Sequence, residues 1–166
     1  GWSMFSTDYV NNRISRINYQ VPYGVSYTLD YATSINGLVN PYGIDTYVDN
    51  DILKCYLYVS NSGNNTISKI NINGITEMSE WYQGLANPRG LVVYDGYLYV
   101  SNLENNTIVK ISIEYPIDNQ VFATVTQGLN RPYGLYVYDD YLYVSNTGNN
   151  TIDVAYLKLH FYQKHH

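Results

Sequence analysis

Residues 88–102 read PRGLVVYDGYLYVSN and residues 132–146 read PYGLYVYDDYLYVSN, so one stretch occurs almost letter for letter twice, 44 residues apart. An earlier copy starts as PYGI at residues 41–44 and resumes as YLYVSN at residues 56–61, after extra residues around 49–54. Self-similarity at a fixed period of about 20 to 50 residues is typical of propellers, solenoids and arrays. The sequence therefore predicts a repeat architecture, and the extra residues of this copy are expected in a hairpin turn.

A fourth, degraded copy opens the chain. Residues 4–8 (MFSTD) followed by NNRI at 11–14 align with residues 57–61 followed by NNTI at 64–67, but no Pro-x-Gly start comes before them. At the other end, the last copy has no separate fourth strand after its third. We therefore expect a single domain made of a partial unit 1–40, complete units 41–87 and 88–131, and a partial unit 132–166.

The third unit displays the strand pattern most clearly. Residues 91–94 and 97–101 flank Asp95-Gly96, a two-residue hairpin turn of the kind that tolerates positive φ. Strands at 107–113 and 121–126 complete the unit, and four short antiparallel strands form one propeller blade. Both sides of the strand 97–101 are apolar, which is typical of a sheet buried between two neighbouring sheets. The expected fold is all-β: a β-propeller of four-stranded antiparallel blades, with about four blades of which the first and last are incomplete.

Composition narrows the classes of partner. The chain has 166 residues, a formal charge of −5, 21 Tyr and only nine Lys and Arg. A nucleic-acid partner is not expected, because phosphate binding needs a face of gathered cations. The acidic balance favours neutral or basic partners. No apolar run is long enough to span a membrane, so we expect a soluble protein. Tyr, Asn and Ile are also encoded by A+T-rich codons, so their abundance favours a source with an A+T-rich genome, such as a large DNA virus.

The recurring strings Pro-x-Gly-Leu, YLYVSN and GNNTI resemble the NHL repeat. That family has a Pro-x-Gly start, an apolar strand ending in a small residue and Asp, and a Gly-Asn-Asn-Arg-Ile turn. Asp8 with residues 11–14 is the closest match, whereas Asn61, Asn102 and Asn146 stand where the family usually has Asp. The resemblance implies a propeller, commonly a six-bladed ring that needs more residues than this chain has. A fragment, an open arc or one part of an assembly is therefore expected, and unpaired edges favour a homo-oligomer or a larger propeller.

Alternating strand directions place the Pro-x-Gly loops and the turns after YLYVSN at the same end of the sheets. Loops on a rigid scaffold commonly carry binding residues. The Asn-rich turns can also have a purely structural role instead of a binding role. Asn, Ser and Thr cap tight turns, and Gly63 and Gly148 suit positive φ. The variable Pro-x-Gly position is the better functional candidate, since Arg and Tyr are typical interface anchors. The candidate ligand- or partner-binding residues are Tyr42, Arg89, Tyr133, Asp8, Asn61, Asn102 and Asn146.

The leading functional hypothesis is a non-enzymatic scaffold for protein–protein interaction, including self-assembly. The alternative is a ligand- or sugar-binding propeller, or a relative of metal-dependent propeller enzymes that uses Asp8, Asp45 and Glu104 around a divalent ion. RNA binding by stacking on Tyr is disfavoured by the charge. The three histidines lie at positions 160, 165 and 166, so no internal imidazole is available as a base or ligand. We therefore expect no catalytic residue, no resident metal and no cofactor.

Overall fold

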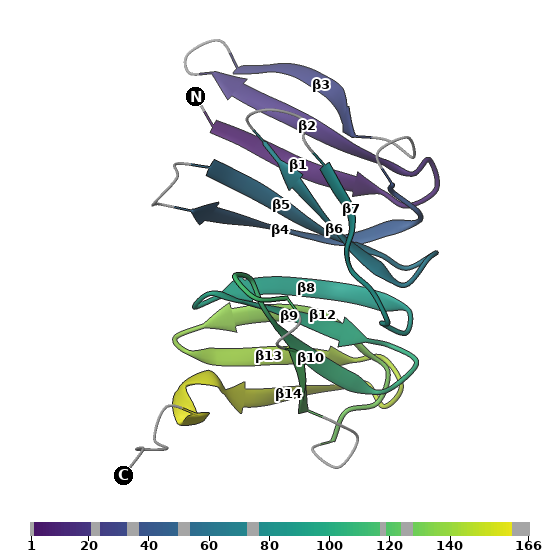
Figure 1. Ribbon diagram of the computed structural model, residues 1–166, viewed down its shortest axis with the longest axis vertical. Coiled ribbons are helices and arrows are strands. Elements are labelled where there is room, and N and C mark those ends of the chain that lie inside the picture. Colours follow the sequence, from purple (N-terminus) through teal and green to yellow (C-terminus); the bar gives the residue numbers. More distant parts are fainter. Residues whose placement is uncertain are drawn as a thin grey trace.

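The computed structural model describes residues 2–20, 24–32, 37–49, 54–72, 77–116, 119–123 and 128–160, which form four antiparallel sheets (Figure 1). The first sheet contains β1 (Trp2–Asp8), β2 (Arg13–Gln20) and β3 (Gly24–Ala32). The second contains β4 (Pro41–Asp49), β5 (Lys54–Asn61), β6 (Thr66–Asn71) and β7 (Glu77–Tyr82). The third contains β8 (Pro88–Tyr94), β9 (Tyr97–Asn102), β10 (Thr107–Ser112) and β11 (Asn119–Ala123). The fourth contains β12 (Pro132–Tyr138), β13 (Tyr141–Asn146) and β14 (Thr151–Tyr156), and a 3₁₀ turn, η3 (Leu157–His160), follows it.

Consecutive strands are neighbours in every sheet, so each sheet is an antiparallel meander. Figure 1 shows the sheets following one another in chain order, with the first and the last at opposite ends of the molecule. The all-β blade architecture with incomplete first and last blades is confirmed, since those two sheets have three strands each. The extra residues 50–53 lie outside the described residues, between β4 and β5. No helix in the described ranges is long and apolar enough to cross a membrane.

Strand β8 begins three residues earlier than the sequence predicts. Pro88 already faces Asn102 on β9, and the pairing then shifts before Leu91 faces Val100. The same irregularity occurs in β4 and β12. The Pro-x-Gly segment is thus the first part of the innermost strand of its sheet rather than a loop before it.

The core consists of three apolar clusters, one at each junction between consecutive sheets. At the junction of the third and fourth sheets, Tyr99 and Ile108 share a cluster with Leu142 and Val144. Every internal sheet therefore has two packed faces. We call the face with the Leu and Val of YLYVSN the preceding face, because it packs on the sheet before it. The opposite face, which packs on the next sheet, is the following face.

The turns follow local backbone chemistry, with one correction. Asp95 and Gly96 both have positive φ, 49° and 76°, as predicted for a two-residue hairpin. Gly63 and Gly148 do not adopt positive φ; the left-handed residues of those turns are Asn65 and Asn150, at 62° and 57°. Glycine is needed there for another reason, because a Cβ at either position would collide with an Asn side chain of the neighbouring loop.

Candidate functional site

Hydroxyl groups at the end of the second strand of the first three repeat units connect neighbouring sheets. Each hydroxyl donates to the backbone carbonyl of the x residue in the next Pro-x-Gly segment. Because a partly buried hydrogen bond holds that carbonyl, the x residue has a fixed position on the preceding sheet. The donor–acceptor pairs are Thr7 Oγ1 with Tyr42 O at 2.8 Å, Ser60 Oγ with Arg89 O at 2.6 Å, and Ser101 Oγ with Tyr133 O at 2.7 Å.

The three x residues, predicted separately from three repeat units, lie together in the structure. The Arg89 Cζ lies 4.8 Å from the ring centre of Tyr42 and 5.8 Å from that of Tyr133. The Tyr9 ring, from the turn after β1, is also 5.8 Å from Cζ. The rings of Tyr42 and Tyr133 meet edge to face at 5.1 Å, and their hydroxyls are hydrogen-bonded. We call Tyr9, Tyr42, Arg89 and Tyr133 the Arg89 cluster.

The guanidinium of Arg89 is held by ring faces rather than by a carboxylate. Its Nε is buried and has no hydrogen-bond partner among the described residues. An unpaired buried donor costs about 1–3 kcal/mol. Because Arg89 as a whole is only half-buried, an acceptor that gains access to its guanidinium would relieve that cost. The hydrogen bond with Tyr133 and desolvation raise the pKa of Tyr42, against the opposing effect of the Arg89 charge. Tyr42 is therefore a neutral phenol near pH 7, and Arg89 contributes the positive charge of the Arg89 cluster.

The other candidates from the turns do not join the Arg89 cluster. Asp8 accepts hydrogen bonds from the backbone and side chain of Asn11, at 3.1 and 2.9 Å, and from Arg13 Nε at 2.9 Å. These bonds, those of Asn11 first, lower the pKa of Asp8 to about 2. Its carboxylate is thus ionised and already coordinated by its own turn.

Asn61, Asn102 and Asn146 are buried, and each accepts a backbone N–H from the loop before its own sheet. The amide of Asn61 also donates to Thr66 Oγ1 at 3.2 Å and to Ser68 Oγ at 2.8 Å. The amides of these three asparagines are engaged in hydrogen bonds within the chain, so the structure does not support a recognition role for them. Their contacts match the structural interpretation of the Asn-rich turns.

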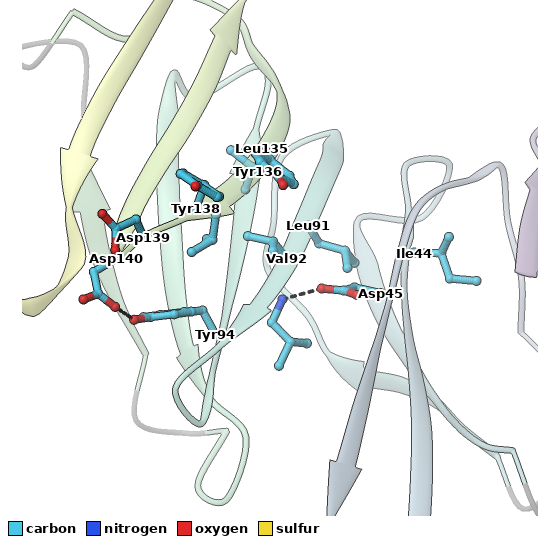
Figure 2. A pocket seen from close by; sticks show the side chains of 12 residues that line it. Ile44, Asp45, Leu91, Val92, Tyr94, Leu135, Tyr136, Tyr138, Asp139 and Asp140 are labelled. Atoms are coloured by element: carbon cyan, nitrogen blue, oxygen red, sulfur yellow. Dashed lines mark hydrogen bonds between the residues drawn. The ribbon is translucent and has the colours of Figure 1, made fainter. Parts of the chain in front are cut away.

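A pocket of about 590 Å³ runs along the innermost strands β4, β8 and β12 (Figure 2). Asp45 accepts the backbone N–H of Val93 at 2.7 Å, and Asp140 accepts the Tyr94 hydroxyl. Lys158 Nζ lies 2.6 Å from Asp140, and the bonds from Lys158 and Tyr94 lower the pKa of this carboxyl. Asp45 and Asp140 are therefore engaged in hydrogen bonds to the third sheet. Asp139 also lines the pocket, and the other lining residues are aromatic or aliphatic.

The metal alternative finds no geometric support. Asp8 and Asp45 are bonded as described, and Glu104 Oε1 accepts the Asn87 amide at 3.1 Å. In the part of the chain that the structure describes, no group of three or more His, Cys, Asp or Glu side chains is arranged to hold a metal ion.

Sequence reasoning missed Tyr9 and the pocket. One signal for Tyr9 exists, because Ser62, Leu103 and Thr147 occupy its repeat position and only the first unit has an aromatic ring there. The pocket has no comparable signal. It forms where the inner strands of three sheets converge, which depends on the angles between the sheets.

Comparison with known proteins shows the fold and no more. No protein-family description matches the chain, and no curated protein matches it. A crystal structure of a nidogen/laminin complex superposes with a TM-score of 0.72 at 22% identity, covering 93% of this chain and 55% of that one. A catalytically inactive virginiamycin B lyase from Staphylococcus aureus with quinupristin gives 0.62 at 20% identity, covering 92% and 50%. A streptogramin B lyase gives 0.59 at 15% identity, covering 94% and 51%. The chain has the β-propeller fold and spans about half the length of these structures.

Proposed function

We propose that this chain is a non-enzymatic interaction module that binds a protein partner through the Arg89 cluster at one end of its innermost strands. The observation that carries the proposal is the half-buried Arg89, whose guanidinium lies among tyrosine rings and whose Nε has no hydrogen-bond partner among the described residues. Arg and Tyr are the residues most enriched among interface anchors. The nidogen structure, which is a complex with laminin, supports protein binding as a use of this fold.

The partner that fits this site presents a hydrogen-bond acceptor, best a carboxylate, next to an apolar or aromatic group. A carboxylate accepts from a guanidinium in a charge-assisted hydrogen bond, and the tyrosine rings offer contact area around it. The chain has a formal charge of −5, which repels strongly acidic proteins. We therefore infer a partner of neutral or basic overall charge that places a single Asp, Glu or terminal carboxylate at Arg89.

We also infer that the module lacks catalytic activity. The lyases among the similar structures are 15 and 20% identical to the chain, a level of likeness that concerns the fold alone. The carboxylates considered for metal chemistry are bonded within the chain. Membership in the NHL group of propellers is likewise a proposal, supported by the Pro-x-Gly and Asn-Asn-Thr-Ile strings and by the shared fold.

A displayed peptide library tests the proposal. Peptides selected on the immobilised protein should be enriched in a carboxylate beside an aromatic residue. The variant Arg89→Ala should bind them about 10- to 100-fold more weakly, because a hydrogen bond to a charged group contributes about 1.5–3 kcal/mol. The control is Arg131→Asn, which removes one charge at an exposed residue whose φ of 51° Asn tolerates. Equal binding by the wild type and Arg89→Ala would refute the proposal.

A further inference from the structure

A cavity of about 670 Å³ lies between the second and third sheets, at the end of the strands opposite to the Arg89 cluster. The second sheet lines it with side chains of its following face, and the third sheet with a hairpin turn and the residue after β10; the residues are Tyr47, Tyr56, Lys69, Asp95-Gly96 and Glu114. Asp95, Gly96 and Glu114 are exposed, so the cavity opens to solvent. Both sheets have all four strands, and the cavity is therefore formed between two complete blades.

The repeat shows what occupies the equivalent place at the next junction, between the third and fourth sheets. There Asp140 stands at the position of Gly96 and pairs with Lys158 at 2.6 Å. Asp140 also accepts the hydroxyl of Tyr94, the counterpart of Tyr47. Gly96 has no side chain that could reach Tyr47, and a Cβ on it would meet no atom within 4 Å. The cavity therefore comes from the residues at this junction and not from the blade architecture that the two junctions share.

Lys69 brings to the cavity an ammonium that lacks a bonded partner. Its Nζ lies 4.2 Å from the ring centre of Tyr56, and among the described residues it has no hydrogen bond and no carboxylate at ion-pair distance. Burial lowers the pKa of Lys69, against the opposing effect of the Asp49 charge. The counterpart Lys110 is 7% exposed, whereas Lys69 is half-buried and lines the cavity. Lys69 is thus a charged donor within reach of a ligand in the cavity.

The charges and rings of the lining favour a neutral ligand rich in hydroxyl groups. Three carboxylates, those of Asp49, Asp95 and Glu114, disfavour an anion, and the ammonium of Lys69 disfavours a cation. A hydroxyl group is both a donor and an acceptor, so it bonds equally well to a carboxylate and to an ammonium. The C–H face of a sugar ring is apolar surface that packs on tyrosine rings. The volume also lies within the range of small-molecule sites, about 300–1,000 Å³.

We propose that this cavity binds a neutral saccharide, whose hydroxyls bond to Lys69 and Asp95 and whose ring packs on the tyrosines of the second sheet. The cavity and the Arg89 cluster lie at opposite ends of the sheets and share no residue. A saccharide therefore binds whether or not a protein partner binds at Arg89, and failure of either proposal leaves the other standing.

The test screens the intact chain on an array of neutral, acidic and amino saccharides and then titrates the best neutral binder by calorimetry. Lys69→Met keeps the aliphatic stem but removes the charged donor, so it should weaken binding about tenfold or more. Gly96→Asp should abolish binding by placing a carboxylate against Tyr47, and Asp140, with a φ of 65°, shows that Asp adopts the required backbone. Lys110→Met, at the same repeat position of the next junction, is the matched control and should bind as the wild type does.

A measurement on the wild type alone decides the matter if a variant does not fold. The bound neutral saccharide should protect Lys69 from acetylation by acetic anhydride, measured by mass spectrometry, and should leave the acetylation of Lys158 unchanged. Binding of no neutral saccharide on the array, or of acidic or amino saccharides in preference, would overturn the proposal. Equal binding by Gly96→Asp and the wild type, or acetylation of Lys69 that the saccharide does not slow, would overturn it as well.

Discussion

The hydroxyl contacts between sheets predict a large difference between two chemically identical substitutions, Ser101→Ala and Ser145→Ala. Ser101 is fully buried; its Oγ accepts the Gly90 N–H at 2.9 Å and donates to the Tyr133 carbonyl at 2.7 Å. Each bond contributes about 1 kcal/mol net, and a buried donor left unpaired costs about 1–3 kcal/mol, so Ser101→Ala should lower the free energy of unfolding by about 2–4 kcal/mol. Among the described residues, Ser145 has side-chain hydrogen bonds only to Gly134 of its own sheet, at an exposed position where water can take the place of the lost hydroxyl. Ser145→Ala should therefore cost about 0.5 kcal/mol or less.

Urea unfolding followed by circular dichroism measures both variants, provided that the slope of unfolding free energy with urea is the same as for the wild type. The wild-type chain is the common reference, and Ser145→Ala is the matched control, because the two residues occupy the same repeat position. Equal losses in the two variants would refute the reasoning, since they would mean that the contact to the next sheet adds nothing to the contact within the sheet.

Four further predictions follow from the same geometry. Ile108→Ala should destabilise the chain by about 2–5 kcal/mol and Ile152→Ala by less than about 0.5 kcal/mol in urea unfolding, because only the first residue is buried; similar losses would contradict the packing described. Gly90→Ala should cost about 1–3 kcal/mol by forcing a methyl group against the Tyr133 carbonyl, while Gly134→Ala should be nearly neutral in the same assay. The pKa of Asp8, lowered to about 2, predicts a contribution to stability that is present above about pH 4 and is lost as the pH falls toward 2. The difference in unfolding free energy between the wild type and Asp8→Asn should therefore shrink over that range. A difference that grows as the pH falls would contradict the prediction. Incubation with quinupristin should leave its reversed-phase retention time and its fragment-ion spectrum unchanged, both of which a ring-opened isomer of the same mass would alter; any conversion would show that the chain is an enzyme.

The repeat made the sheets predictable, because each unit carries its own strand alternation and turn residues. The Asp95-Gly96 hairpin and the three-stranded end sheets follow from local sequence alone. The start of β8 at Pro88 was not predictable, since it depends on an irregular pairing with Asn102 that no propensity encodes. Gly63 was misjudged for a related reason: its constraint comes from the side chain of Asn40 in another loop, and not from its own backbone.

The candidate site was predictable only in part. Variation inside a frame that recurs within the chain, Pro-x-Gly, pointed to Arg89 and its two tyrosine neighbours, and the structure brings all three together. The unpaired Nε–H donor of Arg89 could not be predicted from the sequence, because it depends on which acceptors the packing leaves within reach. Asn61, the last residue of β5, was expected at the same end of the sheets as Arg89, yet its amide is buried and bonded to its neighbours.

The nuclear magnetic resonance signal of the Arg89 Nε–H group tests the central claim most directly. The signal is followed while a library-selected peptide with one carboxylate is added to the intact chain, and a peptide with Gln or Asn in place of the acidic residue serves as the control. If Arg89 anchors the partner, the signal moves downfield and saturates with the binding isotherm for the acidic peptide, and moves little for the neutral one. If peptide binding saturates while the Arg89 signal stays in place, the Arg89 cluster is not the recognition site.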